Sequence, residues 1–133
     1  MQEKGRLTMN NPDNLKYTKE HEWILLEQKT ATIGITDYAQ SQLGDIVFVE
    51  LPDLDDEVKQ DGTFGVIEAV KTVADLFAPV SGKVIEINLD LEDSPDLINS
   101  DPYGAGWIIK TQIENNDEIA ALMSSSEYQE YIK

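Results

Sequence analysis

Lys71 has the setting that most suggests chemistry, because it stands alone among apolar neighbours. The nearest other basic residues are 12 positions away on either side. Strand-like runs flank it at residues 64–70 and 72–77, so the sequence predicts a β-hairpin with the lysine at or beside its tip. Residues 70–72 lack the Asn-Gly or Asp-Gly pair that favours a tight hairpin turn. An amine on such a turn is either an ordinary solvated lysine or one presented for modification or contact.

Other side chains suited to catalysis give weaker signals. His21 is the single histidine, so a serine–histidine–acid triad would have to use it and a multi-histidine metal site is excluded. It lies between two acids at the edge of a predicted strand, where it is either a structural residue or a ligand or partner contact. The chain has no cysteine, which removes thiol nucleophiles and thiolate metal sites. Nucleotide-binding and hydrolase motifs are missing, and we expect neither catalytic residues nor a metal site.

Composition and charge restrict the partners. The chain has 133 residues, which fits one domain, and 10 Lys and Arg against 26 Asp and Glu give a formal net charge of −16. Nucleic acids and anionic membranes bind basic faces, so the acidic balance argues against both and favours basic enzyme surfaces. No apolar run is long enough to cross a membrane. The first residues lack the features of a secretory or transit segment, so we expect a cytoplasmic protein.

Short runs at close spacing predict a mainly β fold, a small antiparallel sandwich or barrel with brief helices at its edges. The predicted strands are residues 22–26, 30–35, 45–51, 64–70, 72–77, 83–88 and 107–113. The predicted helices are residues 37–43 between Thr36 and Gly44, 94–98, 116–123, and a last one through Tyr131 that opens on the capping box of Ser124 and Glu127.

Several stretches, in order along the chain, resemble the glycine cleavage system H protein family. The longest, residues 65–88, is similar to the hairpin on which that family carries lipoate. The resemblance extends from about Leu15 to Tyr131, nearly the whole chain. The other matching stretches are residues 17–23, 33–40, 44–52 and 99–107.

The resemblance implies a fold and a domain layout. The fold would be the barrel-sandwich hybrid of lipoyl and biotinyl carriers, mainly β with short peripheral and C-terminal helices. A flexible segment would occupy residues 1–14, and a single lipoyl-carrier domain residues 15–133. Asp55 stands where the family usually has glycine, and we expect the left-handed bend to survive because Asp tolerates that conformation better than most residues.

The resemblance also implies a carrier rather than an enzyme. Lys71 would bear lipoate in an amide bond and take the aminomethyl group of glycine from a pyridoxal-phosphate glycine decarboxylase to a tetrahydrofolate-dependent aminomethyltransferase. Dihydrolipoamide dehydrogenase would reoxidise the arm, and a lipoate ligase or lipoyltransferase would attach it. The carrier is expected to be a monomer.

Particular residues take roles from this resemblance. Glu68, Val70 and Thr72 flank the attachment lysine and would be recognised by the lipoylating enzyme. Ala69 departs from the serine that is common in the family. The hairpin register stays open, because pairings centred on Lys71 or on Val70 and Lys71 both align apolar residues.

A cleft for the loaded arm is a further implication. By motif position, Glu22 and Asp75 are candidates for holding the cationic amine, with His21 nearby. The alternative is that all three are polar surface residues.

Four other functions remain as alternatives. A lipoyl domain of a 2-oxoacid dehydrogenase also presents a lysine on a hairpin, but such domains are shorter and lack the motif at residues 101–103. A biotin carrier more often has Met beside its lysine. A lipoate relay protein would share the fold while serving other lipoyl enzymes, and a β binding module would leave Lys71 unmodified.

Overall fold

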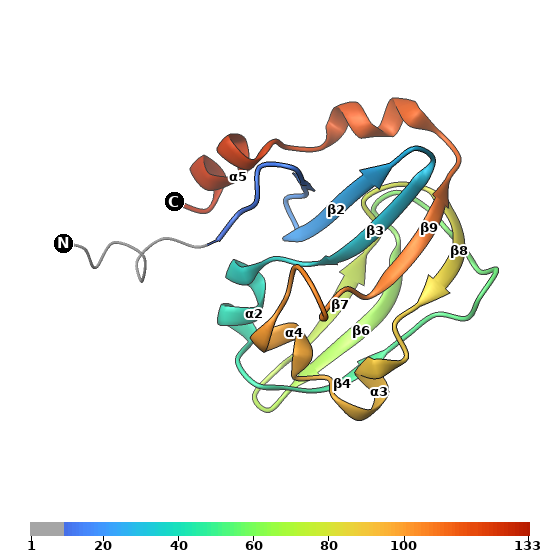
Figure 1. Ribbon diagram of the computed structural model, residues 1–133. Helices are drawn as coiled ribbons and strands as arrows, with labels where there is room; N and C mark the ends of the chain where they lie inside the picture. Colours follow the sequence, from blue (N-terminus) through green and yellow to red (C-terminus); the bar gives the residue numbers. More distant parts are fainter. Residues whose placement is uncertain (1–9) are drawn as a thin grey trace.

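Two antiparallel sheets make up most of the structure, a computed structural model that describes residues 10–133 (Figure 1). A six-stranded sheet has the order β1-β2-β3-β9-β8-β5, and a three-stranded sheet the order β4-β6-β7. The strands are β1 (Lys16–Tyr17), β2 (Glu22–Glu27), β3 (Thr30–Ile35), β4 (Ile46–Glu50), β5 (Glu57–Val58), β6 (Thr63–Ala69), β7 (Val73–Phe77), β8 (Gly82–Ile87) and β9 (Ile109–Ile113).

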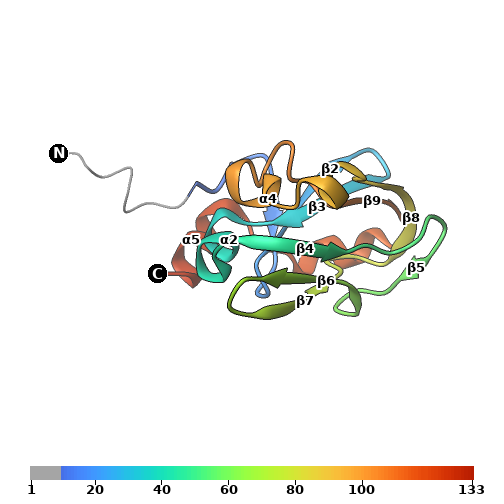
Figure 2. The ribbon, with the colours of Figure 1, turned by 90° about the horizontal axis from the view of Figure 1, so that it is seen from below.

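The predicted mainly β class is confirmed. All seven predicted strands are present, with ends shifted by at most two residues. The described residues form two separate sheets and not a closed barrel. Figure 2 shows these sheets as layers, with β6 and β7 on one side and β2, β3 and β9 on the other.

Short helices lie at the edges of the sheets, as the sequence predicted, but their details differ in the second half of the chain. Helix α2 has the predicted bounds, and the Thr36 side chain caps it by accepting from the Ala39 N–H. The predicted helix 94–98 is shifted toward the C-terminus: α4 begins at Leu97, after a turn in which the Leu97 and Ile98 N–H groups donate to the Ser94 and Pro95 carbonyls. The helices are α2 (Asp37–Leu43), α3 (Asp90–Asp93), α4 (Leu97–Ser100), the 3-10 helix η1 (Asn116–Ala121) and α5 (Ser125–Tyr131).

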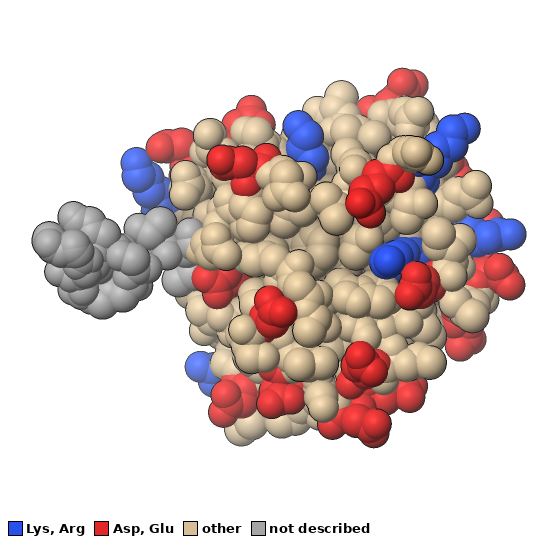
Figure 3. All heavy atoms as spheres, in the orientation of Figure 1, with Lys and Arg blue, Asp and Glu red and all other residues tan. Residues whose placement is uncertain are grey.

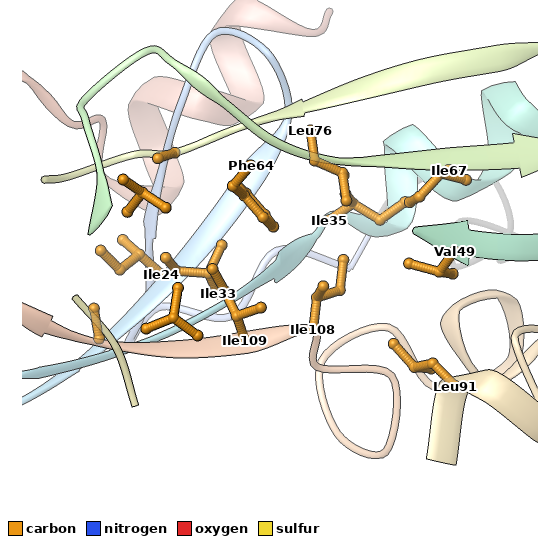
Figure 4. Close-up of a cluster of buried hydrophobic side chains, with 14 of the residues drawn as sticks. Ile24, Ile33, Ile35, Val49, Phe64, Ile67, Leu76, Leu91, Ile108 and Ile109 are labelled. Atoms are coloured by element: carbon orange, nitrogen blue, oxygen red, sulfur yellow. The ribbon is translucent and has the colours of Figure 1, made fainter. Parts of the chain in front are cut away.

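The main core lies between the two sheets. Ile24, Ile33 and Ile109 come from the six-stranded sheet and are fully buried. Ile67 and Leu76 face them from the three-stranded sheet (Figure 4). Removing this apolar surface from water is the main stabilising contribution to the packing of the two layers.

A smaller cluster fixes the C-terminal helix. Leu15, Tyr17, Trp23 and Tyr128 pack together, each with at most 6% of its surface exposed. The rings of Tyr17 and Tyr128 stack with centroids 4.8 Å apart and planes within 8°. Helix α5 opens on the predicted capping box, which is present in full. The helix is therefore anchored both by its cap and by an aromatic stack on β1.

The predicted flexible segment, residues 1–14, lies largely outside the described residues, which begin at Asn10. The part that is described contacts the domain. The Asn11 carbonyl accepts a hydrogen bond from the Ser125 hydroxyl, and the Pro12 carbonyl accepts one from the Tyr17 hydroxyl. The boundary between segment and domain stays a prediction.

The predicted left-handed bend is confirmed at Asp55, which has φ of 72°. Its N–H donates to the Val84 carbonyl at 2.8 Å, so the bend joins β5 and β8 closely. Among the described residues, no helix has the length and apolar character needed to span a bilayer.

We predict that Gly34→Ala destabilises the protein by about 1–3 kcal/mol, because the strand pair β2–β3 leaves no room for a methyl group there. Gly34 lies opposite Trp23, and an added Cβ would come within 2.7 Å of the indole ring. Urea unfolding measures the loss. The same change in a Trp23→Phe background should cost less, because the smaller ring withdraws the clashing atoms. An equal loss in both backgrounds would contradict the clash.

Candidate functional site

The tip of the β6–β7 hairpin presents the predicted lysine. Glu68 pairs with Val73, and the Ala69 N–H donates to the Thr72 carbonyl at 2.8 Å. The two-residue turn is therefore centred on Val70 and Lys71, which settles the register that the sequence left open. Neither residue has a positive φ, so the turn is not one of the primed types that usually close such hairpins.

Contacts from outside the hairpin support this unfavourable turn. The Val70 N–H donates to the Asp45 carbonyl at 3.0 Å. Gly44, the residue that ends α2, has φ of 80°, and a Cβ placed on it would lie 3.3 Å from Cε and 3.8 Å from Nζ of Lys71. The lysine side chain therefore passes over a residue that has no side chain of its own. In Figures 1 and 2 the hairpin tip accordingly lies beside the segment that leads from α2 to β4.

The residues predicted to flank the attachment lysine are all exposed. Val70 has 74% of its surface exposed. Glu68 lies on the outer face of the three-stranded sheet, where the register places it between Phe48 of β4 and Val73 of β7. The surface beside the lysine thus combines exposed apolar side chains with a carboxylate.

A cleft of about 420 Å³ lies between β2, α2 and β7. The three residues predicted for an arm cleft, His21, Glu22 and Asp75, all line it. Helix α2 contributes further lining residues that the sequence analysis did not single out, namely Tyr38, Ala39, Gln42 and Leu43. Leu43, which lines the cleft, directly precedes Gly44, over which the Lys71 side chain passes. The cleft and the lysine side chain are therefore neighbours at the end of α2.

The cleft is acidic. Three of the described residues that line it are acids, Glu20, Glu22 and Asp75, and none is Lys or Arg. The wider surface has the same sign, since acidic side chains outnumber basic ones on the face shown in Figure 3 and gather along the edge with α3. A cation is therefore favoured over an anion in the cleft.

The sequence of the chain agrees with one family along nearly its whole length. A model of the Glycine cleavage H-protein family matches residues 15–133. The chain belongs to this family. The resemblance found in the sequence motifs is thereby confirmed.

Relatives and a solved structure agree with this assignment. The glycine cleavage system H protein of Staphylococcus saprophyticus is 54% identical over 121 residues, which cover 91% of this chain and 96% of the relative. That of Staphylococcus epidermidis is 52% identical over the same shares of both chains. The crystal structure of a glycine cleavage system H protein from Mycobacterium marinum superposes with a TM-score of 0.79 at 38% identity, covering 88% of this chain and 94% of the other.

Glu22 is the most unusual member of the cleft, because an acid is buried there with 2% of its surface exposed. The Thr18 hydroxyl donates to one carboxylate oxygen at 2.6 Å and the Phe77 N–H to the other at 3.1 Å. Burial raises the pKa of Glu22 to about 7, against the lowering effect of these two hydrogen bonds. Near neutral pH the carboxyl group is close to the midpoint of its titration, and a bound cation would favour its ionised form.

His21 and Asp75 complete the predicted set. His21 has φ of 73° and its ring lies 4.9 Å from that of Tyr38, centroid to centroid. Burial lowers the pKa of His21, so the ring is neutral at neutral pH. Asp75 is exposed on β7, opposite Val66 of β6, and brings its charge to the cleft.

The contribution of α2 to the site was not predicted from the sequence. The helix itself was predicted with the correct bounds, but no role was expected for its side chains. Tyr38 and Gln42, and likewise Ala39 and Leu43, are four residues apart and so lie on one face of the helix. This spacing was the available signal, because both pairs belong to the face that lines the cleft.

We predict that stability depends on pH through Glu22. Because its folded-state pKa is raised from 4.5 to about 7, the folded protein binds more protons than the unfolded chain in that window, and stability falls as pH rises through it. Relative to Glu22→Gln, the wild type should lose about 3 kcal/mol between about pH 4 and about pH 8. Urea unfolding of both proteins at both pH values measures this difference. Parallel pH profiles for the two proteins would refute the assignment.

Proposed function

We propose that Lys71 carries lipoate in amide linkage and that the neighbouring acidic cleft receives the loaded end of that arm. In its family the chain acts as the carrier of the glycine cleavage system. The observation that carries the proposal is the position of Lys71. Its side chain passes over Gly44, at the end of the helix that lines the cleft.

The hairpin suits covalent attachment. Lys71 is exposed at a turn, and its neighbours at the hairpin tip are exposed as well. A modifying enzyme can therefore enclose the amine. Glu68, Val70 and Thr72 would be the contacts that this enzyme recognises. Amide formation removes the lysine charge and makes the formal net charge one unit more negative than −16. When bound, lipoate supplies the sulfur and redox chemistry that a chain without cysteine lacks.

The cleft suits a small ammonium group. Glu22 and Asp75 provide carboxylate acceptors, the first buried and the second exposed. Neutral His21 adds no competing positive charge. The apolar lining from Ile67 and Leu43 excludes water from part of the volume, which strengthens the attraction between an ammonium and the carboxylates. These properties support shelter for the aminomethyl group of glycine, the cargo of this carrier.

The partners we propose are the pyridoxal-phosphate glycine decarboxylase, the aminomethyltransferase and dihydrolipoamide dehydrogenase, with a lipoate ligase or lipoyltransferase as modifying enzyme. A lysine at a protruding tip can enter several active sites in turn. The net charge of −16 favours fast association with basic surfaces without tight complexes. Salt should accordingly slow these encounters.

We predict that protein produced with a lipoate ligase gains one lipoyl increment and that Lys71→Arg abolishes it. Intact-mass spectrometry measures the increment. Lys83→Arg, a change at an exposed lysine on β8, is the matched control and should be modified like the wild type. A biotinyl increment would indicate the rival cofactor. The absence of any increment on the wild type would favour the unmodified binding module.

We predict further that Glu22→Gln shortens the lifetime of the aminomethylated protein several-fold, because one carboxylate of the cleft is lost. The loaded protein is made with glycine and the decarboxylase, and its mass is followed over time. Glu92→Gln removes the same charge at an exposed position on α3 and serves as control. Equal lifetimes for both variants and the wild type would contradict a role for Glu22 in protecting the aminomethyl group.

A separate assay tests the alternative function. Failure of the wild-type protein to support glycine–bicarbonate exchange would favour the lipoate relay.

A further inference from the structure

We propose that the C-terminal helix α5 sets the state of the cleft through Tyr128. A hydrogen-bond chain from Thr36 through Tyr128 to His21 holds the imidazole in its neutral form with the proton on Nε2. Tyr128 is then a positioning residue for a cleft that it does not itself line. The importance of this state for a cationic cargo rests on the proposed function, whereas the hydrogen-bond chain itself does not.

The three groups form a continuous chain. The Tyr128 hydroxyl lies 2.8 Å from His21 Nδ1 and 2.8 Å from Thr36 Oγ1. Tyr128 and Thr36 both have 0% of their surface exposed. Water is therefore kept from the shared hydroxyl group, and each hydrogen of the chain needs a partner within the protein.

The surroundings of Thr36 decide the direction of these bonds. Its Oγ1 caps α2 by accepting from the Ala39 N–H at 3.1 Å, so one acceptor site is filled. Its own hydrogen needs an acceptor, and Tyr128 is the other side-chain partner of this hydroxyl among the described residues. Thr36 therefore donates to Tyr128, because the reverse direction would leave a buried hydroxyl hydrogen without a partner, which is costly.

The same reasoning continues to the imidazole. Since the Tyr128 oxygen accepts from Thr36, its single hydrogen is free to be donated to Nδ1 of His21. A ring nitrogen that accepts a hydrogen bond has no proton, so the proton of the neutral ring is on Nε2. An imidazolium would place a hydrogen on Nδ1 as well, and Tyr128 would then have to turn its hydrogen away from His21.

Packing keeps both ends of the chain in place. The Tyr128 ring is stacked on Tyr17, and its helix is capped. On the other side, the His21 N–H donates to the Thr18 carbonyl at 3.1 Å, and the His21 carbonyl accepts from the Thr36 N–H at 3.0 Å. One hydrogen bond to Thr18 and one from Thr36 therefore hold the His21 backbone in its positive-φ conformation.

The charges around His21 show why its state matters. Glu20 raises the pKa of His21 but burial lowers it more. Glu22 and Asp75 share the cleft with it, while Tyr38 and Tyr131 face its ring from α2 and α5. A neutral ring leaves the carboxylates of the cleft uncompensated and available to a cation. An imidazolium would offset one of these charges.

The test uses the fact that His21 is the single histidine of the chain. In the full-length protein labelled with ¹⁵N-histidine, two-bond NMR correlations should show an unprotonated Nδ1 and a protonated Nε2 at neutral pH. In Tyr128→Phe, which keeps the ring but removes the hydroxyl, the fraction of the neutral ring protonated on Nδ1 should rise, and the midpoint of the ring's titration should move upward by at least several tenths of a pH unit. A wild-type ring protonated on Nδ1 would overturn the proposal.

Tyr131→Phe is the matched control. The Tyr131 ring also packs near His21, with centroids 5.9 Å apart, but its hydroxyl donates to the Lys19 carbonyl at 3.1 Å. The histidine signals and titration should stay as in the wild type. A purely structural effect of losing a tyrosine hydroxyl on α5 would move both variants alike, and this would overturn the proposal. The NMR measurement needs no lipoate. Its outcome is therefore independent of whether Lys71 is modified, and a failure of this proposal can be told apart from a failure of the proposed function.

Discussion

The burial of one carboxylate, that of Glu22, is the constraint on which the site depends. The group lies where the six-stranded sheet meets the three-stranded sheet, and it accepts hydrogen bonds from Thr18 beside β2 and from Phe77 of β7. Two hydrogen bonds do not fully replace the water that burial removes, which is why its pKa is raised. The fold thus keeps a buried acid with a raised pKa in the lining of a cleft, where a bound cation would favour its ionised form.

The other parts of the site are arranged around this acid by segments that are far apart in the sequence. Helix α2 supplies one wall of the cleft and, at Gly44, the surface over which Lys71 passes. The turn between α2 and β4 holds the hairpin tip through the Asp45 carbonyl. Helix α5 is joined to the cleft by the hydrogen bond between Tyr128 and His21 and by the packing of Tyr131 beside the same imidazole. Lys71, the end of α2 and the buried Glu22 are therefore parts of one packed unit.

Much of this arrangement follows from local sequence signals. Alternating strands, the capped helix α2, the capping box of α5 and the bend at Asp55 were all predictable because their causes lie within a few residues. The hairpin register was not, because it depends on a contact with Asp45, and both pairings align apolar residues equally well. Tyr128 gave no signal at all, since the histidine it contacts lies 107 positions away. The helix expected over residues 94–98 begins later, at Leu97, after a turn that starts at Ser94.

The close approach of Lys71 to Gly44 has a consequence for any chain attached to the lysine. When a tether is attached to a freely rotating side chain, its free end samples a wide volume. The free end then spends little time near any one binding group. Here the first part of the tether already lies against the protein, next to the helix that leads to the cleft. For the arm proposed above, this contact would raise the effective concentration of the far end at Glu22 before any specific contact forms. Because Gly44 has no side chain, an arm attached to Lys71 would lose less conformational entropy when its far end binds in the cleft.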